Sequence, residues 1–211
     1  MWEKEKKHAD ILPTQMPKKK KLVAWMVSKC ETYSKRENYV KELQKYIEVD
    51  IYGHCGPLKC AKHDNACLDM LENDYKFYLS FENTICDGYV TEKLFKILSL
   101  NLVPVTFGGG PYSEIAPPNS YVNALSYESP KQLAEYLKFL DKNDEKYIEY
   151  FKWKKNYFVW TGRGPVICDA CRKLHLLEEQ SKIYPDIPGW FVETAQCKRW
   201  PIEDKTYVPK K

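Results

Sequence analysis

The sequence has no uninterrupted apolar stretch near the ~20 residues that a membrane-spanning helix needs, and its start, MWEKEKKHAD, has no apolar core of a signal peptide. We therefore expect no membrane span within this chain. The composition excludes a disordered or low-complexity protein, because 44% of the 211 residues are hydrophobic and 29% are charged. A chain of this length is expected to form one core.

The chain also lacks a basic body. Its 33 Lys and Arg residues against 29 Asp and Glu give a net charge of +4, and residues 1–21, with seven lysines and three acids, account for all of it. A neutral body argues against a nucleic-acid partner, whose basic surface should extend through the fold. No glycine-rich run is closed by Lys and Ser or Thr, which excludes a Walker-type phosphate loop.

Short apolar runs alternate with amphipathic stretches along the chain. Strands are predicted at residues 22–28, 49–52, 75–83 and 102–107. Helices are predicted from Arg36, over 89–100, after an N-cap at Ser129, over 144–157 and over 171–180. The stretch up to Met70 is predicted to be an irregular crossover with at most one helical turn, and the chain beyond Pro185 to be irregular. Alternating strands and helices imply parallel pairing. We therefore predict an α/β fold with an open, doubly wound parallel sheet.

The segment FENTICDGYVTEKLF, residues 81–95, concentrates polar groups where a strand ends and a helix begins. Ligands of such sheets bind beyond the carboxyl ends of the strands. Lys93 in the first helical turn opposes the positive end of the helix macrodipole unless an anion lies between them, which suggests a bound phosphate. Arg36 begins the first helix at the same edge and could clamp a phosphate with two N–H groups. The alternative is that Arg36, Glu92 and Lys93 are ordinary surface residues.

The same residues point to a known family. FENTICDGYVTEKLF, followed by NLVPVTFGGGPYSEIAPPNSYV, closely resembles the donor-binding motif of the α-1,3-fucosyltransferases, glycosyltransferase family 10. The match places F-E-N, Y-V-T-E-K-L, V-P-V and P-P-x-S in order, and the likeness covers roughly residues 21–160. The C-terminal CDACRKLH resembles invertebrate and plant enzymes that fucosylate the N-glycan core.

The resemblance implies an inverting transferase of the GT-B type with two Rossmann-like domains, of which this chain would be the C-terminal half that binds GDP-fucose. By motif position, five residues would bind the donor: Arg36, Asn83, Tyr89, Glu92 and Lys93. Arg36 and Lys93 would face the diphosphate, and Glu92 would contact ribose or fucose hydroxyls. Two fixed cations stabilise the charge that develops on departing GDP. No cofactor or metal is then required, and Mn²⁺ would act at most as a stimulant.

The resemblance also sets expectations for the rest of the enzyme. The general base would lie in an N-terminal acceptor domain that this chain lacks, together with the membrane anchor and stem, so we expect a fragment with no catalytic residue of its own. The product would carry L-fucose in α-1,3 linkage to GlcNAc of an N-glycan, and the enzyme would lie in the Golgi lumen. The expected parts are a basic linker (1–21), a GDP-fucose-binding domain (22–160) and a Cys-containing C-terminal helix and tail (161–211).

Eight cysteines require an explanation of their own. A lumenal location favours disulfides, but the spacing does not reveal the pairs. The alternative from another class is a zinc-binding interaction module, built on two clusters: Cys55, Cys60, His63 and Cys67, and Cys168, Cys171 and His175. Neither spacing matches a common zinc finger. A third interpretation is a remnant that binds a GDP-sugar without catalysis.

Overall fold

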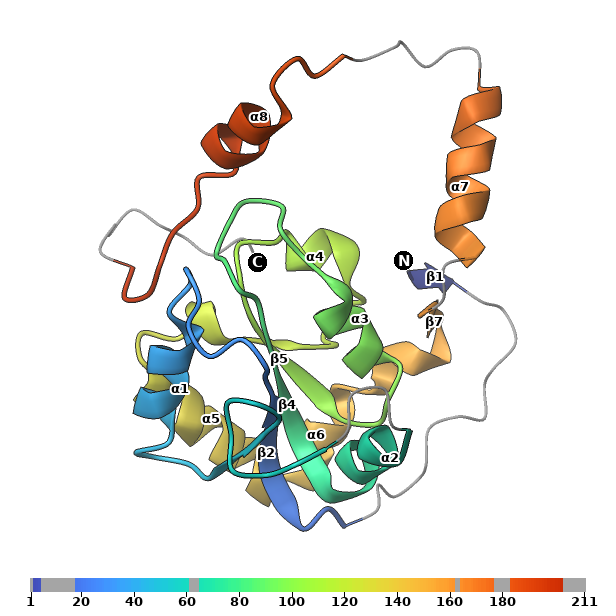
Figure 1. The fold of residues 1–211 in the computed structure, drawn as a ribbon. Coiled ribbons are helices and arrows are strands. Elements are labelled where there is room, and N and C mark those ends of the chain that lie inside the picture. The colour runs from blue at the N-terminus through green and yellow to red at the C-terminus, as the bar shows by residue number, and fades with distance from the viewer. Residues whose placement is uncertain (1, 5–17, 61–64, 162–163, 177–182, 203–211) are drawn as a thin grey trace.

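The structure, a computed structural model, describes residues 2–4, 18–60, 65–161, 164–176 and 183–202. Its centre is a five-stranded sheet in the order β3-β2-β4-β5-β6, in which all neighbours are parallel (Figure 1). The strands are β2 (Lys21–Met26), β3 (Val49–Tyr52), β4 (Tyr75–Phe81), β5 (Val103–Phe107) and β6 (Val122–Asn123). The predicted open parallel α/β fold is confirmed.

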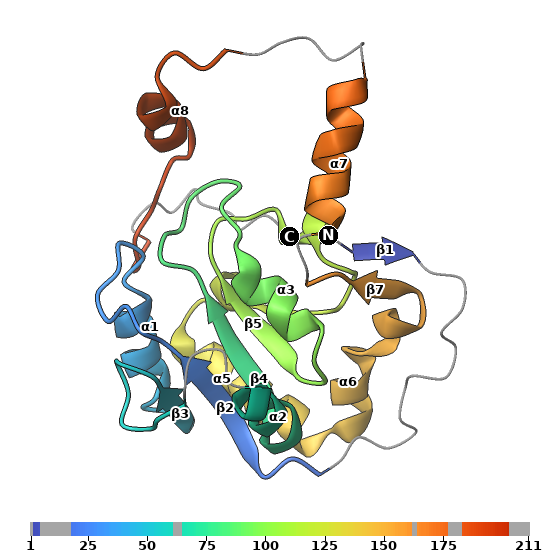
Figure 2. The ribbon, with the colours of Figure 1, turned by 45° about the vertical axis from the view of Figure 1, so that its right-hand side comes forward.

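Side chains alternate between the two faces of the sheet, as extended backbone requires. On β2, Val23 and Trp25 enter the larger core, whereas Ala24 enters a second core on the opposite face. The larger core is completed by α1 (Arg36–Leu43), α5 (Pro130–Lys142) and α6 (Asp144–Glu149), and the second by α2 (Asn65–Asp74) and α3 (Glu92–Leu98) (Figure 2). Helices thus cover both faces.

The order of the strands reverses between β2 and β4. The chain passes from β2 outward to β3, returns to β4 on the other side of β2, and then continues through β5 to β6. Such a switch point leaves a crevice between the carboxyl ends of the two strands, because the loops that follow them diverge. Here the loops 27–35 and 82–91 follow the two strands, and they lead into Arg36 and Lys93, which the sequence predicts to face a ligand.

The remaining elements surround this sheet. They are β1 (Trp2–Lys4), α4 (Tyr112–Ile115), the 3₁₀ turns η1 (Ala124–Ser126) and η2 (Lys152–Lys155), β7 (Tyr157–Val159), α7 (Gly164–His175) and α8 (Ile187–Thr194). β1 lies within the predicted linker and pairs antiparallel with β7. The division into three parts stays a prediction. Among the described residues, no helix is both long and apolar enough to cross a membrane.

Several predicted elements differ from the observed ones at their ends or in kind. The crossover, predicted to be irregular with at most one helical turn, contains the ten-residue helix α2, whose Cys67 and Leu71 are buried. The helix predicted over residues 144–157 ends at Glu149, since the chain tightens into η2 and then pairs as β7 with β1. In these places tertiary burial and pairing override local pattern.

The C-terminal helices were also placed incorrectly. α7 spans Gly164–His175 instead of 171–180, of which residues 177–180 lie outside the described part of the chain. α8 occupies a stretch predicted as irregular, and Asp186 caps it by accepting a hydrogen bond from the Gly189 amide at 3.0 Å. The Ser129 cap of α5 is confirmed, since its side chain accepts from the Gln132 amide at 3.3 Å.

Candidate functional site

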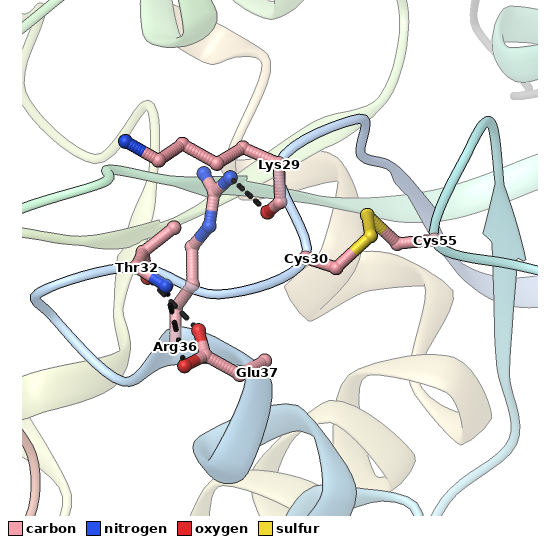
Figure 3. Close-up of a disulfide and its surroundings, with 6 residues drawn as sticks. All are labelled: Lys29, Cys30, Thr32, Arg36, Glu37 and Cys55. Atoms are coloured by element: carbon pink, nitrogen blue, oxygen red, sulfur yellow. Dashed lines mark hydrogen bonds between the residues drawn. A yellow bond between two sulfur atoms is a disulfide. The ribbon is translucent and has the colours of Figure 1, made fainter.

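The loop after β2 is fixed from two sides before it enters α1. Cys30 forms a disulfide with Cys55, which lies just beyond β3. Glu37, in the first turn of α1, accepts hydrogen bonds from the Thr32 amide at 3.3 Å and the Thr32 hydroxyl at 2.9 Å (Figure 3). An acidic side chain at this position also complements the helix macrodipole. The loop therefore presents Arg36, the first residue of α1, in a defined place.

Arg36 connects the two sides of the crevice. Its guanidinium donates from Nη1 to the Phe81 carbonyl at 2.5 Å and from Nη2 to the Lys29 carbonyl at 3.3 Å, so it joins the ends of β4 and β2. Arg36 is only 4% exposed, and burial lowers its pKa, against the opposing effect of Glu82 and Glu37. Its Nε has no hydrogen-bond partner among the described residues. The side chain is thus a structural bridge with N–H groups left over.

Lys93 is held by a buried carboxylate. Its Nζ lies 2.9 Å from Oε2 of Glu82 and 2.6 Å from Oγ1 of Thr91. Glu82 is 1% exposed and also accepts a hydrogen bond from the Thr91 amide at 2.8 Å, at the beginning of α3. The anion expected between Lys93 and the helix macrodipole is therefore supplied by the chain itself. The electrostatic argument from the sequence does not by itself require a bound phosphate.

The other three predicted donor residues follow the end of β4. The Asn83 carbonyl accepts a hydrogen bond from the Ser34 amide at 2.9 Å, while Oδ1 of Asn83 is buried without a partner among the described residues. Tyr89 is half-buried, and the Glu92 side chain is 78% exposed, with its Oε1 3.7 Å from the Lys93 ammonium. All five predicted residues thus lie along the carboxyl edge of β2 and β4.

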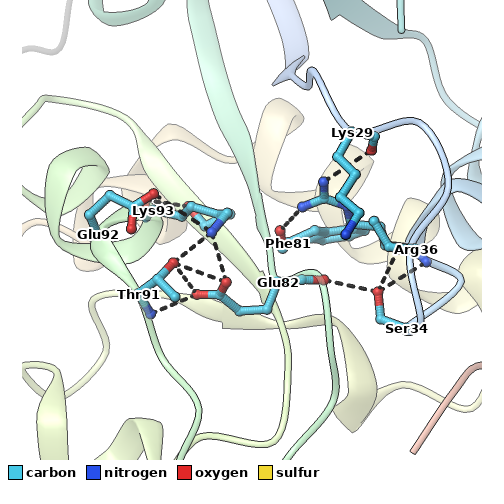
Figure 4. Close-up of polar contacts among 10 residues, drawn as sticks. Lys29, Ser34, Arg36, Phe81, Glu82, Thr91, Glu92 and Lys93 are labelled. Atoms are coloured by element: carbon cyan, nitrogen blue, oxygen red, sulfur yellow. Dashed lines mark hydrogen bonds and ion pairs between the residues drawn. The ribbon is translucent and has the colours of Figure 1, made fainter.

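Figure 4 shows how Glu82 separates the two cations. Lys93, Thr91 and Glu92 lie on one side of Glu82, and Arg36 lies on the other. The sequence analysis assigned Glu82 no role, although Glu82 lies within the segment FENTICDGYVTEKLF, here called the central motif. It also missed Ser34, whose hydroxyl donates to the Glu82 carbonyl at 2.9 Å. No local signal in the sequence predicts this role of Ser34, because Glu82, Asn83 and Trp200, which it contacts, are distant in the chain.

The glycine triplet after β5 allows the chain to approach itself. A Cβ on Gly109 would lie 2.5 Å from the Cys86 carbonyl oxygen, and one on Gly110 would lie 2.0 Å from Cγ2 of Val90. Both distances are too short for packed atoms. The triplet is therefore needed for the loop after β5 to pack against the segment between β4 and α3, which keeps that side of the crevice in place.

The cysteines mostly form disulfides, as expected. Three bonds, Cys30–Cys55, Cys60–Cys67 and Cys86–Cys197, use six of the eight cysteines. The first predicted zinc cluster is therefore wrong, and its His63 lies outside the described residues. Cys168 and Cys171 are free and exposed on α7. Within the described ranges, no three His, Cys, Asp or Glu side chains are grouped to hold a metal ion.

An open hollow of about 640 Å³ lies beside the crevice, beyond the carboxyl ends of β2 and β3. Ser28, His54, Lys59 and the Cys60–Cys67 disulfide contribute to its lining. None of the five predicted donor residues lines this hollow. The predicted donor residues lie beside it instead, at the carboxyl ends of β2 and β4, where the strand order reverses.

Comparison with known proteins gives consistent results. The family described as "Glycosyltransferase family 10 (fucosyltransferase) C-term" matches residues 16–190. Alpha-(1,3)-fucosyltransferase C of Drosophila melanogaster is 46% identical over 182 residues, which cover 85% of this chain and 42% of the relative. Glycoprotein 3-alpha-L-fucosyltransferase A of Drosophila melanogaster is 44% identical over 190 residues, which cover 85% of this chain and 36% of the relative.

A solved structure shows that the fold is shared as well. The crystal structure of an alpha1,3-fucosyltransferase with GDP-fucose matches 80% of this chain and 50% of its own chain, with a TM-score of 0.59 and 22% sequence identity. This chain spans less than half the length of the two Drosophila relatives. The family match over most of the chain and the identity to these relatives show that it belongs to glycosyltransferase family 10, the fucosyltransferases, and corresponds to their C-terminal part.

Proposed function

We propose that this chain is the donor-binding part of an enzyme that transfers L-fucose from GDP-fucose, in α-1,3 linkage and with inversion, to GlcNAc of N-glycans. Family membership and the names of the relatives support the transfer of fucose. A relative named as a glycoprotein fucosyltransferase supports a glycoprotein acceptor. The three disulfides suit an oxidising compartment, which agrees with a Golgi location.

The observation that carries the proposal is the placement of two cations on opposite sides of the crevice at the switch point. Arg36 extends from the β2 side, and Lys93 from the β4 side. Open α/β sheets bind nucleotides in this crevice. A diphosphate there would meet the Lys93 ammonium, whose side chain is 27% exposed, and the remaining N–H groups of Arg36. The buried Oδ1 of Asn83 would accept a hydrogen bond from a hydroxyl group of GDP-fucose.

The chemistry of transfer explains why fixed cations suit this place. An acceptor hydroxyl attacks the anomeric carbon of fucose as the bond to the β-phosphate breaks, and negative charge accumulates on GDP. Preorganised cations stabilise this charge most, because they need not reorient during the reaction. The Glu82 pair and the Phe81 carbonyl hold Lys93 and Arg36 in place. Binding and leaving-group stabilisation are therefore assigned to the same two residues.

The acceptor proton must go to a carboxylate, and neither Glu82 nor Glu92 of the described residues is suited to take it. Glu82 is fully committed, since it accepts hydrogen bonds from Thr91 and pairs with Lys93 while only 1% exposed. The resemblance assigns Glu92 to donor hydroxyls. We therefore place the general base outside this chain. If no such partner exists in the complete protein, the same donor site would serve as a binding remnant.

Titration calorimetry tests the donor site directly. We expect the chain to bind GDP and GDP-fucose with micromolar affinity, and GMP more weakly, because GMP lacks the β-phosphate that both cations would face. Failure to bind GDP would contradict the proposal. Binding without transfer, even after fusion to an acceptor domain from a relative, would identify the remnant instead.

A further inference from the structure

The chain returns to the crevice after α8. Residues 195–202, here named the C-terminal strap, run back from α8 past the loop that follows β2 (Figures 1 and 2). On the β4 side the strap is bonded covalently, because Cys197 forms a disulfide with Cys86. The Asp87 amide donates to the Ala195 carbonyl at 2.7 Å, and the Lys198 amide donates to the Ile85 carbonyl at 2.7 Å. The strap thus pairs antiparallel with the loop that follows β4.

The same strap also reaches the β2 side. The Trp200 amide donates to the Ser34 carbonyl at 3.0 Å. The Trp200 ring packs edge-on against Tyr39 with centroids 5.3 Å apart, and the Arg199 guanidinium lies 5.2 Å from the centre of the Tyr33 ring. Tyr39 belongs to α1, one turn after Arg36. Residues 197 and 200 therefore connect the two sides of the crevice from outside the sheet.

Ser34 is the point where these connections meet. Its carbonyl accepts from Trp200, its amide donates to the Asn83 carbonyl at 2.9 Å, and its hydroxyl donates to the Glu82 carbonyl at 2.9 Å. Ser34 is fully buried. A shift of the strap would therefore be transmitted to the residues that precede Arg36 and to those that begin the central motif.

We propose that the C-terminal strap sets the spacing of the two sides of the crevice, with Cys197 and Trp200 as positioning residues for the donor site. This inference rests on the proposed function, because it assigns the strap an effect on GDP affinity. Neither residue needs to touch the nucleotide. The strap holds Arg36 and Asn83 at a fixed separation, so the diphosphate meets a preformed site and binding needs less ordering of the loops.

The test compares strap variants with matched controls in the whole chain. We expect Trp200→Ala and the double variant Cys86→Ser with Cys197→Ser to weaken GDP binding by about tenfold or more, since small displacements of positioned groups are costly. Trp200→Phe keeps an aromatic contact with Tyr39 and should restore most of the affinity. The disulfide control, Cys60→Ser with Cys67→Ser, should change GDP affinity by less than about twofold.

A second control separates positioning from general stability. Tyr147→Phe removes a buried hydrogen bond to the Lys76 carbonyl at the start of β4, far from the strap, and should lower the melting temperature by about 2–4 °C while GDP affinity is retained. If the strap variants lose no more affinity than this control and the Cys60 and Cys67 control, the inference is overturned. Full affinity in Trp200→Ala would overturn it as well.

Amide hydrogen exchange tests, in the absence of any ligand, whether the strap positions the two loops. In Trp200→Ala we expect the amides of Ser34 and Asp87 to exchange faster while amides of β5 stay protected, because the backbone hydrogen bonds described above join the strap to the two loops. Unchanged exchange at both loops would overturn the inference. If the native chain fails to bind GDP, the proposed function fails, but the exchange result still decides whether the strap positions the two loops.

Discussion

Two pairs of basic side chains, one pair at each edge of the sheet, differ in their partners. At the amino edge, the Lys154 ammonium donates to the Leu100 carbonyl at 2.6 Å and to Oδ1 of Asn101 at 2.9 Å, and Lys19 donates to the Asn101 carbonyl. At the carboxyl edge, Lys93 is paired with the buried carboxylate of Glu82, and Arg36 bridges two strand ends.

The difference shows what keeps a cation ready for an anionic ligand. Carbonyl oxygens satisfy the N–H groups of an ammonium but carry no full charge, so they offset less of the desolvation than a carboxylate does. Burial accordingly lowers the pKa of Lys19 to about 7 and that of Lys154 to about 8, with only Glu72 opposing it. The carboxyl edge instead contains a buried acid within its network. The lysines at the amino edge support the fold, whereas the proposed diphosphate site lies at the carboxyl edge.

The largest expected effect concerns catalysis at the carboxyl edge. Because Glu82 is committed to Lys93 and Thr91, we expect this chain alone to transfer no fucose at a useful rate. Loss of a general base alone costs about 10²–10⁴-fold in rate, and an unpositioned acceptor adds to that loss. The measurement is an assay with GDP-fucose and a core N-glycan, with the chain fused to a relative's acceptor domain as the comparison. Robust turnover that disappears in Glu82→Gln or Asp87→Asn would contradict the assignment.

Glu82→Gln should break the difference between the two edges. The side-chain amide of the new glutamine carries no charge to neutralise Lys93, and one of the N–H groups of this amide would face the Lys93 ammonium or the Thr91 hydroxyl. We expect a loss of about 3 kcal/mol in the free energy of unfolding, at the lower end for a disrupted buried pair because Lys93 retains some solvent contact. Urea unfolding measures this loss. Glu92→Gln is the control: its exposed carboxylate should contribute less than about 0.5 kcal/mol, and equal losses in both variants would refute the burial argument.

The binding role of the two cations is tested by Lys93→Ala and Arg36→Ala. Each should weaken GDP binding by about 1.5–3 kcal/mol, the usual range for a hydrogen bond to a charged group. Calorimetry measures the affinity, and Lys96→Ala and Lys41→Ala are exposed controls on α3 and α1 that should leave it unchanged. Unchanged GDP affinity in both Lys93→Ala and Arg36→Ala would contradict the assignment of the site.

The smallest effect is expected at the amino edge and depends on pH. The unfolded chain keeps Lys154 protonated up to its ordinary pKa near 10.5, whereas the folded chain releases the proton near 8, so stability should rise with pH between about 7 and 9. The contribution of Lys154 over this interval is about 1.3 kcal/mol. Lys154→Met should reduce the rise in unfolding free energy, and the exposed neighbour control Lys155→Met should not. Identical pH profiles of the native chain and Lys154→Met would exclude the effect.

Much of this fold follows from local pattern. The apolar runs at β2, β3, β4 and β5 and the amphipathic α1 and α5 were predicted with small errors at their ends, because each contains a complete period of buried and exposed positions. Elements that depend on a distant partner were missed or misjudged. β1 and β7 form a separate two-stranded sheet in which Trp2 pairs with Val159, and the buried Leu71 of α2 joins a core whose strands the local sequence does not reveal.

For the site, short segments of the sequence specify which chemistry is available: the central motif, the two cations and the resemblance to a fucosyltransferase donor site are all contained in them. How these residues are used depends on the tertiary fold. The tertiary structure reverses the strand order between β2 and β4. It also joins residues that are 11 to 111 positions apart, through the pairing of Glu82 with Lys93, the hydrogen bond from Ser34 to Glu82 and the disulfide between Cys86 and Cys197. Such contacts depend on which surfaces become buried together when the chain closes, and no local spacing specifies that.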